Sequence, residues 1–345
     1  MKYTTLPNTD IKISKICLGT MTFGEQNTEA DGHAQMDYAL EKGINFFDTA
    51  EMYSVPGRKE TYGSTEKILG TWFKKSGKRE DIFLASKIAG PNPGLAHIRE
   101  NMDFSPESIA LSIDKSLTRL QTDYIDLYQL HWPERKTNFF GQRGFKVQDD
   151  AWEDNIQNVL ETLESFIKQG KINHIGLSNE TPWGIMRFLE ESKYQNLPRI
   201  KTVQNPYSLL NRTFEIGSAE VCMRENVGLL AYSPMGFGVL SGKFLSGESH
   251  PNSRIKLFPQ FARYNSAQSA EATRLYNEIA NKNGLTLTEM ALAFVNQQAF
   301  VTSTIIGATT MEQLKENIAS IDVVLSEEIL KEIDAVQAVI PDPAP

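Results

Sequence analysis

The chain has 345 residues, of which 40% are hydrophobic and 23% charged, as expected for a globular protein with a full-sized core. Its formal net charge is -8 and no basic stripe is present, so a nucleic-acid partner is not expected, because binding phosphates requires a clustered basic surface. Cys17 and Cys222 lie far apart, and no apolar run approaches the roughly 20 residues of a membrane span. These features argue against a disulfide framework and a membrane segment, and they suit a cytoplasmic protein.

The chain begins with two short segments, around 3–6 and 11–13, that flank a turn and are typical of a β-hairpin. An alternation of apolar strands and amphipathic helices follows. Strands are predicted at 16–18, 44–47, 82–87, 124–130, 172–177, 201–204, 229–232 and 304–306. Helices are predicted between and after them, including 29–42, with Ala34, Tyr38 and Ala39 on one face, then 65–73, 105–117 with Ser105 as its cap, and 156–168.

Eight strand–helix units without a low-complexity linker favour a (β/α)8 TIM barrel that occupies residues 1–345 as a single domain. The alternative is a doubly wound sheet, which would normally bind a dinucleotide through a glycine-rich turn after its first strand. Here that turn reads Gly19-Thr20-Met21-Thr22-Phe23-Gly24, which lacks the GxGxxG spacing. We therefore expect a barrel with an N-terminal β-hairpin and no Rossmann domain.

Proton-carrying side chains follow three consecutive predicted strands. Asp48 and Tyr53 come after the second strand, Lys87 ends the third and His131 ends the fourth. Catalytic groups of barrels collect at these carboxyl ends, because all the loops there open onto one face. Each residue alone could be a surface cation, a core histidine, a loop aromatic or a solvated strand end. Together they would have to reach three successive strand ends by chance, so a site is the better interpretation.

These four side chains suit proton transfer to an oxygen that becomes an alkoxide. A tyrosine has an ordinary pKa near 10, and an adjacent ammonium such as Lys87 lowers it. Asp48 would hold Lys87 charged, and His131 would orient a substrate carbonyl oxygen. A metal-dependent hydrolase is the less favoured interpretation, because His131 is the one histidine of five placed at this site, and no metal is expected.

At this point the chain resembles the aldo-keto reductase family, whose Asp, Tyr, Lys, His tetrad corresponds to Asp48, Tyr53, Lys87 and His131. Four segments, 18–26, 130–133, 204–212 and 307–311, look like the bacterial Tas-type branch. That branch is similar to the β subunits of voltage-gated potassium channels. The resemblance implies NADPH-dependent reduction of aldehydes or ketones, with hydride from nicotinamide C4 and Tyr53 as the proton donor. It also leaves open an alternative, a protein that senses NADP(H) and regulates a partner.

The resemblance further implies that NADPH or NADP+ binds in extended form. The residues implied for the cofactor are Gly19, Thr20, Met21, Asp48, Ser178, Asn179, Gln204, Tyr232, Ser233, Pro234, Gly238, Lys243, Arg254, Gly307, Thr309, Gln313, Glu316 and Asn317. Among them, Tyr232 would stack on the nicotinamide, or it could be a core aromatic at the barrel rim. Segment 306–309 lacks the lysine and arginine that the family commonly has there, so more of the preference for a 2′-phosphate rests on Arg254, with Lys243 second.

The substrate pocket is assigned to Tyr53, Met52, Trp132 and Phe139, the last two in a long segment, 132–150, without clear periodicity. Connections of this length are usually functional or disordered. The apolar side chains could line a pocket above the nicotinamide that takes aromatic or medium-chain carbonyl compounds. They could equally pack the long segment onto the barrel.

Overall fold

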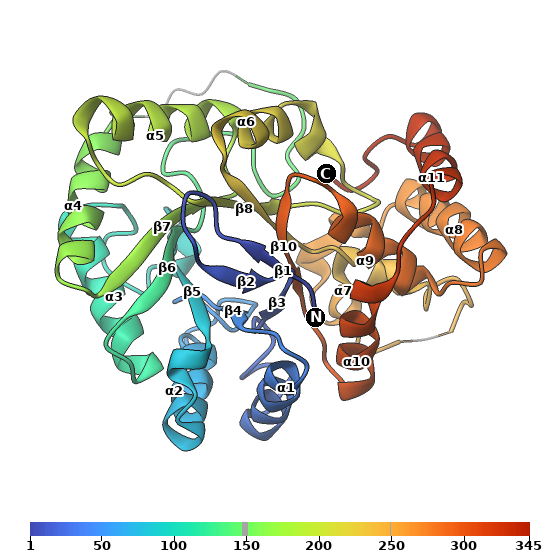
Figure 1. The fold of residues 1–345 in the computed structure, drawn as a ribbon, viewed down its shortest axis with the longest axis horizontal. Coiled ribbons are helices and arrows are strands. Elements are labelled where there is room, and N and C mark those ends of the chain that lie inside the picture. The colour runs from blue at the N-terminus through green and yellow to red at the C-terminus, as the bar shows by residue number, and fades with distance from the viewer. Residues whose placement is uncertain (147–150, 249) are drawn as a thin grey trace.

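Eight parallel strands close into a ring at the centre of the computed structural model, which describes residues 1–146, 151–248 and 250–345 (Figure 1). Around the ring the strands follow the order β10-β3-β4-β5-β6-β7-β8-β9. They are β3 (Ile16–Gly19), β4 (Phe46–Asp48), β5 (Phe83–Ile88), β6 (Ile125–Leu130), β7 (Ile172–Ser178), β8 (Thr202–Pro206), β9 (Gly228–Tyr232) and β10 (Val301–Ile306). Each predicted strand has a counterpart here, so the prediction of a (β/α)8 barrel is confirmed.

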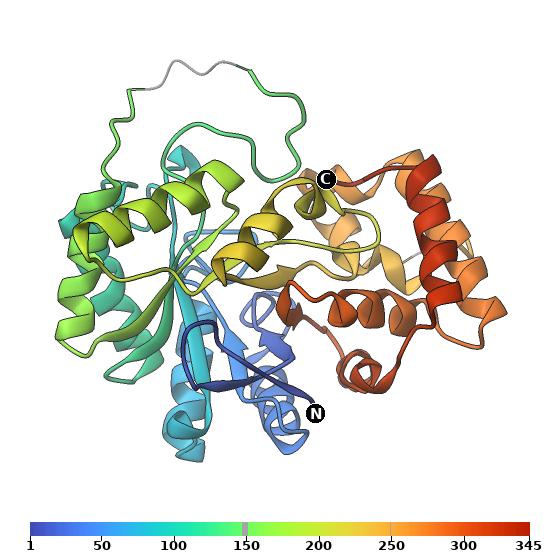
Figure 2. The same cartoon turned by 45° about the horizontal axis from the view of Figure 1, so that its top comes forward.

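Helices surround the ring (Figures 1 and 2). They are α1 (Glu29–Glu41), α2 (Ser64–Ser76), α3 (Pro106–Leu120), α4 (Ile156–Lys168), α5 (Pro182–Gln195), α6 (Ser218–Glu225), α7 (Arg254–Leu257), α8 (Ala267–Lys282), α9 (Leu287–Gln297), α10 (Met311–Ala319) and α11 (Glu327–Val339). Short 3-10 helices include η4 (Gly236–Ser241) and η5 (Pro259–Tyr264). Over the described ranges, none of the helices has the length and apolar character needed to cross a membrane.

The predicted N-terminal hairpin closes one end of the barrel. Strands β1 (Tyr3–Thr5) and β2 (Lys12–Ser14) pair antiparallel, and in Figure 1 they lie over the centre of the ring. Leu6 and Ile13, both fully buried, pack in one cluster with barrel residues such as Phe46. Burial of apolar surface on this side seals the bottom of the barrel, so the carboxyl ends of the strands face the open end.

Helix boundaries follow the capping signals of the sequence, but one predicted helix face is wrong. The Ser105 hydroxyl accepts a hydrogen bond from the Ser108 N–H at 3.3 Å, as expected of a helix cap. In α1, however, Ala34 is exposed, and the buried face includes Gly32 and Gln35. A Cβ on Gly32 would lie 3.0 Å from the Phe23 ring, so this face requires a residue without a side chain, which hydrophobic periodicity does not reveal.

The long segment after β6 leaves the barrel without forming a helix or strand in its described part, 132–146. Figure 2 shows it extending toward the C-terminus of the chain, where Arg143 donates to the Asp342 carbonyl. Residues 147–150, the remainder of the segment considered in the sequence, lie outside the described residues. The described part therefore borders the open end of the barrel.

Helices α2 and α3 pack closely through a glycine and a buried ion pair. The Glu66 carboxylate on α2 accepts from Arg119 Nε at 2.7 Å and from the Ser86 hydroxyl on β5 at 2.6 Å. Gly70, one turn further along α2, faces the Arg119 carbonyl, and a Cβ there would lie 2.2 Å from that oxygen. Close approach of the two helices thus depends on the missing side chain at Gly70.

We expect Gly70→Ala to destabilise the protein, although alanine is the better helix former. The overpacked contact should lower the free energy of unfolding by about 1–3 kcal/mol, seen as a lower thermal midpoint by circular dichroism. Gly307→Ala is the control, because a Cβ there would meet no atom within 4 Å. An unchanged or raised midpoint for Gly70→Ala would contradict the close packing of α2 on α3.

Candidate active site

A cleft of about 1020 Å³ opens at the carboxyl ends of the barrel strands. Its walls include every residue predicted for the cofactor: Gly19, Thr20 and Met21 at the end of β3 and after it; Asp48 at the end of β4; Ser178 and Asn179 at the end of β7 and after it; Gln204 on β8; Tyr232, Ser233, Pro234, Gly238 and Lys243 at the end of β9 and after it; Arg254 on α7; and Gly307, Thr309, Gln313, Glu316 and Asn317 after β10. The walls also include Met52, Tyr53, His131 and Trp132. The fold therefore gathers these residues in one place, while their individual roles stay predictions.

The ammonium of Lys87 lies beneath the cleft and is completely buried. Its Nζ donates to Asp48 Oδ1 at 2.6 Å, to the Thr49 carbonyl oxygen at 2.7 Å and to Tyr53 Oη at 3.4 Å. An ammonium has three N–H donors and no acceptor. Each Lys87 hydrogen thus has a protein acceptor, and one of the three is the tyrosine oxygen.

Burial and neighbouring charges have opposite effects on the pKa of Lys87, and burial and the Lys87 charge have opposite effects on the pKa of Tyr53. Burial by itself would lower the pKa of Lys87, but Asp48 and Tyr53 more than offset it, so the pKa lies above its ordinary value. Burial also raises the pKa of Tyr53, and the Lys87 ammonium offsets only part of that rise. The sequence predicted a lowered pKa for Tyr53. The effect of Lys87 has the predicted sign, but the net direction is upward because desolvation of the phenolate is larger.

The second carboxylate oxygen of Asp48 is held by two amides. Gln204 Nε2 donates to Asp48 Oδ2 at 2.8 Å, and Gln129 Nε2 donates to the same oxygen at 3.3 Å. Sequence reasoning missed Gln129. The available signal was its position on β6, two residues before His131, since alternate residues of a strand face the same side.

His131 lies at the cleft as a neutral imidazole. Burial and, next, the Lys87 charge hold the pKa of His131 well below its ordinary value. Its ring meets the Tyr53 ring edge-on, with centroids 5.7 Å apart, and the Asn179 amide donates to its main-chain carbonyl at 2.9 Å. The tetrad residues therefore share one buried neighbourhood beside the cleft.

Amide and hydroxyl groups form the next part of the wall. Asn179 Nδ2 donates to Ser178 Oγ at 3.1 Å, and the Tyr232 hydroxyl donates to Asn179 Oδ1 at 2.6 Å. Burial raises the pKa of Tyr232 to about 12, with partial compensation by Arg263, so its hydroxyl stays protonated. This set offers neutral donors and acceptors of the kind that recognise a carboxamide.

The cleft wall also carries the cations Arg254 and Lys243. Burial lowers the pKa of Arg254 to about 10, which still leaves it charged near neutral pH. Over the described ranges of the chain, no carboxylate lies within 4 Å of the Arg254 guanidinium. The Ser253 hydroxyl, missed from the sequence, is buried, lines the cleft and has no hydrogen-bond partner among the described residues. A partly buried cation beside this hydroxyl suits an anion such as phosphate.

Two glycines of the cleft wall, Gly238 and Gly307, leave room for a ligand. Gly238, in η4, has φ of 89°, a left-handed conformation that favours glycine. A Cβ at Gly307 would meet nothing within 4 Å, so the chain after β10 faces open space. The residues present therefore fit an extended dinucleotide phosphate.

Another part of the cleft wall is apolar. It includes Met21, Met52, Leu95 and Trp132, as well as Phe140. Phe139, predicted for this pocket, is not among the lining residues. Its ring packs edge-on against Phe140, 5.0 Å between centroids, and contributes to the cluster around Trp132. Phe140 thus lines the cleft and Phe139 packs in the cluster around Trp132, while a role of either ring in binding substrate stays a prediction.

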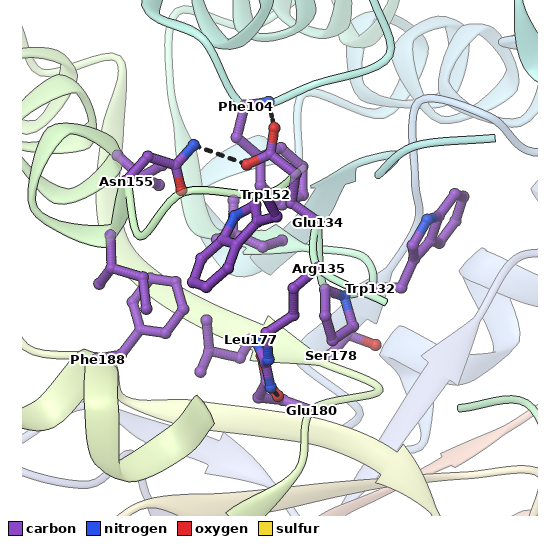
Figure 3. Close-up of a pocket in the computed structure, with 14 residues that line it drawn as sticks. Phe104, Trp132, Glu134, Arg135, Trp152, Asn155, Leu177, Ser178, Glu180 and Phe188 are labelled. Carbon is purple, nitrogen blue, oxygen red and sulfur yellow. Dashed lines mark hydrogen bonds and ion pairs between the residues drawn. The ribbon is translucent and has the colours of Figure 1, made fainter. Parts of the chain in front are cut away.

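A small cavity of about 20 Å³ lies behind the segment that follows β6 (Figure 3). The Glu134 carboxylate beside it accepts from the Phe104 N–H at 3.2 Å and from Asn155 Nδ2 at 2.8 Å. Arg135 forms an ion pair with Glu180, which directly follows Asn179 of the cleft wall. These contacts, none of them predicted, anchor the segment that begins at the site histidine.

Comparisons with known proteins agree with this geometry. The model of the Aldo/keto reductase family matches residues 15–338. The chain is 50% identical to Protein tas of Escherichia coli (strain K12) over 346 residues, covering 100% of both chains. It is 34% identical to the uncharacterized oxidoreductase YrpG of Bacillus subtilis (strain 168), over 96% of this chain and 94% of that protein. It is 28% identical to the aldo-keto reductase yakc, named as NADP(+)-dependent, of Schizosaccharomyces pombe, over 92% of this chain and 85% of that one. The chain is therefore an oxidoreductase that belongs to the aldo/keto reductase family.

Proposed function

We propose that residues 1–345, acting as one domain, catalyse the NADPH-dependent reduction of aldehydes or ketones to alcohols, with Tyr53 as the proton donor. The observation that carries the proposal is the hydrogen bond from Lys87 to Tyr53 Oη at 3.4 Å. Because the lysine is the donor, the hydroxyl hydrogen of Tyr53 must point elsewhere. Tyr53 lines the cleft, so that hydrogen is available to an oxygen of a bound substrate.

The surroundings of Tyr53 favour release of its proton only when the substrate oxygen becomes a stronger base during the reaction. Burial keeps Tyr53 protonated at neutral pH because its pKa is raised. A carbonyl oxygen that becomes an alkoxide is a strong base, and the Lys87 ammonium stabilises the phenolate that proton transfer leaves behind. Neutral His131 has one ring N–H to donate to the carbonyl oxygen and fix its orientation.

NADPH, when bound, supplies the hydride from nicotinamide C4. Ser178, Asn179 and Gln204 would hold its carboxamide, since these side chains line the cleft beside Asp48. Arg254 and Lys243 would bind the phosphate groups, and the Ser253 hydroxyl adds a donor. The absence of a carboxylate within 4 Å of Arg254, over the described ranges, supports a preference for the 2′-phosphate.

The apolar end of the cleft supports a substrate class. Met21, Met52, Leu95 and Trp132 offer hydrophobic surface beside Tyr53 and His131. Aromatic and medium-chain carbonyl compounds would bury apolar area there, whereas small charged sugars would lose hydration without compensation. A cytoplasmic location stays a prediction.

The alternative is an NADP(H)-sensing interaction protein with incidental turnover. The aligned Lys87 and Tyr53 pair favours catalysis, because a sensor needs only the cofactor contacts. A steady-state screen of carbonyl compounds with NADPH separates the two: tight cofactor binding without turnover on any aldehyde would favour the sensor.

Replacing Tyr53 by phenylalanine tests the proton donor. Tyr53→Phe should lower kcat for an aromatic aldehyde at least about 100-fold, because general acid catalysis is lost. NADPH binding, followed by quenching of protein fluorescence, should change little, which also shows that the variant is folded. Aldehyde reduction at the rate of the unchanged protein would disprove this role.

The pH dependence of reduction follows from the directions of the two pKa shifts. Protonated Tyr53 is the active form, and its raised pKa keeps it protonated as pH rises through the neutral range. His131 does not gain a proton near neutral pH because its pKa lies well below ordinary. We expect kcat to stay constant from about pH 6.5 to about pH 10, which are the ordinary pKa values of histidine and tyrosine. Above this range kcat should fall as Tyr53 loses its proton. A loss of activity centred near the ordinary histidine value would contradict this assignment.

Removing the Arg254 charge tests cofactor selectivity. Arg254→Gln should weaken NADPH binding about 10- to 100-fold, the usual effect of losing a charged hydrogen bond, while NADH binding changes much less. Arg224→Gln, at an exposed arginine paired with Glu220, is the control for net charge. Equal losses for NADPH and NADH in Arg254→Gln would place the 2′-phosphate elsewhere.

A further inference from the structure

A glutamine inside the barrel connects the cofactor wall to the charged pair beneath it. Gln129 on β6 is completely buried. Its Nε2 donates to Asp48 Oδ2 at 3.3 Å, and its Oε1 accepts from Gln204 Nε2 at 3.3 Å. Gln204 Nε2 also donates to Asp48 Oδ2 at 2.8 Å. The three side chains therefore form a closed triangle of hydrogen bonds.

This triangle decides what Gln204 offers to the cleft. A primary amide nitrogen has two N–H donors, and in Gln204 one is directed to Asp48 and the other to Gln129. Gln204 lines the cleft, so the group that remains for a ligand is its carbonyl oxygen, Oε1. A flipped amide would place that oxygen against the Asp48 carboxylate and against Gln129 Oε1, which is unfavourable in a buried site. Gln204 is thus held as an acceptor for an N–H donor such as the amide of a carboxamide.

The same triangle orients the Asp48 carboxylate. Two amide donors hold Oδ2, while Lys87 Nζ binds Oδ1 at 2.6 Å. Rotation of the carboxylate would break all three contacts together. Gln129 therefore helps to fix the Asp48 carboxylate, whose negative charge stabilises the Lys87 ammonium and, through it, affects Tyr53.

We propose that Gln129 is a positioning residue that couples the two halves of the site, holding Gln204 as a hydrogen-bond acceptor for the nicotinamide carboxamide and Asp48 against Lys87. The inference rests on the proposed function, because it assigns Gln204 to the cofactor and Tyr53 to proton transfer. Gln129 itself touches neither substrate nor cofactor, since it lies below the cleft wall.

Loss of the Gln129 amide should change proton transfer from Tyr53 in one direction. Over the described ranges, the charged or titratable groups that face Tyr53 are Lys87 on β5, Asp48 on β4, His131 after β6, Tyr232 on β9 and Arg254 on α7. Without the Gln129 amide, the negative charge on Asp48 is less compensated, and one amide fewer holds the carboxylate in place. Stronger negative charge near Tyr53 and a less fixed Lys87 both disfavour the phenolate. Both effects move the alkaline limb of kcat to higher pH.

The test uses a substitution that keeps the side-chain length and removes the amide. Gln129→Met should weaken NADPH binding about 3- to 10-fold, as expected for one buried hydrogen bond, measured by fluorescence titration without substrate. In a double-mutant cycle, Gln129→Met should have little further effect on NADPH affinity when Gln204 is already methionine. The alkaline limb of kcat for Gln129→Met should lie at higher pH than that of the unchanged protein.

Tyr128→Phe is the matched control, because Tyr128 is the adjacent buried residue and donates instead to Ser112 on α3 at 2.8 Å. It should alter neither NADPH affinity nor the alkaline limb, whatever its effect on thermal stability. Additive losses from Gln129→Met and Gln204→Met, or an unmoved alkaline limb, would overturn the role of Gln129 while leaving the proposed function intact. Failure of the unchanged protein to bind NADPH would overturn both.

Discussion

The buried ammonium of Lys87 is the charge on which the arrangement of the site depends. An isolated ammonium in a barrel interior would be strongly destabilising, so its surroundings must supply acceptors. Asp48 and the Thr49 carbonyl supply two, and their positions follow from the register in which β4 pairs with β5. The third acceptor is the oxygen of Tyr53. Because Tyr53 Oη accepts a hydrogen bond from the lysine, its own hydrogen points into the cleft. The contacts that stabilise the buried lysine therefore also orient the proposed proton donor.

Two cations of the site, Lys87 and Arg254, have opposite surroundings. Lys87 is compensated within the protein by Asp48, which is itself held by two amides. Arg254 has no carboxylate within 4 Å over the described ranges, and burial lowers its pKa to about 10. The compensated cation suits a permanent role in tuning Tyr53, whereas the uncompensated one gains most from an anionic ligand. This contrast is the physical reason for assigning the tuning of Tyr53 to Lys87 and phosphate binding to Arg254.

Sequence patterns predicted the barrel well, because short apolar runs locate buried parallel strands. Catalytic residues of barrels lie at the carboxyl ends of these strands, which places Asp48, Lys87 and His131 at the same open end. Sequence patterns did not predict Gln129, whose partners Asp48 and Gln204 are 81 and 75 residues away along the chain. Strand alternation places Gln129 on the same face as His131, but it does not reveal these distant partners. Phe139 was assigned to the pocket, whereas Phe140 lines the cleft, because a segment without periodicity does not show which of two adjacent rings faces inward. Ser253 was missed since an unpaired hydroxyl is visible only once its neighbours are known.

Direct hydride transfer is the central claim, and isotope labelling tests it most directly. NADPH deuterated at C4, prepared separately at each of the two positions, is reacted with an aromatic aldehyde, and the alcohol is examined by NMR and mass spectrometry. A nicotinamide held on one face by Tyr232 predicts deuterium on the carbinol carbon from one labelled position and none from the other. An alcohol free of deuterium with both cofactors, or equally labelled by both, would contradict hydride transfer from a fixed nicotinamide in this cleft.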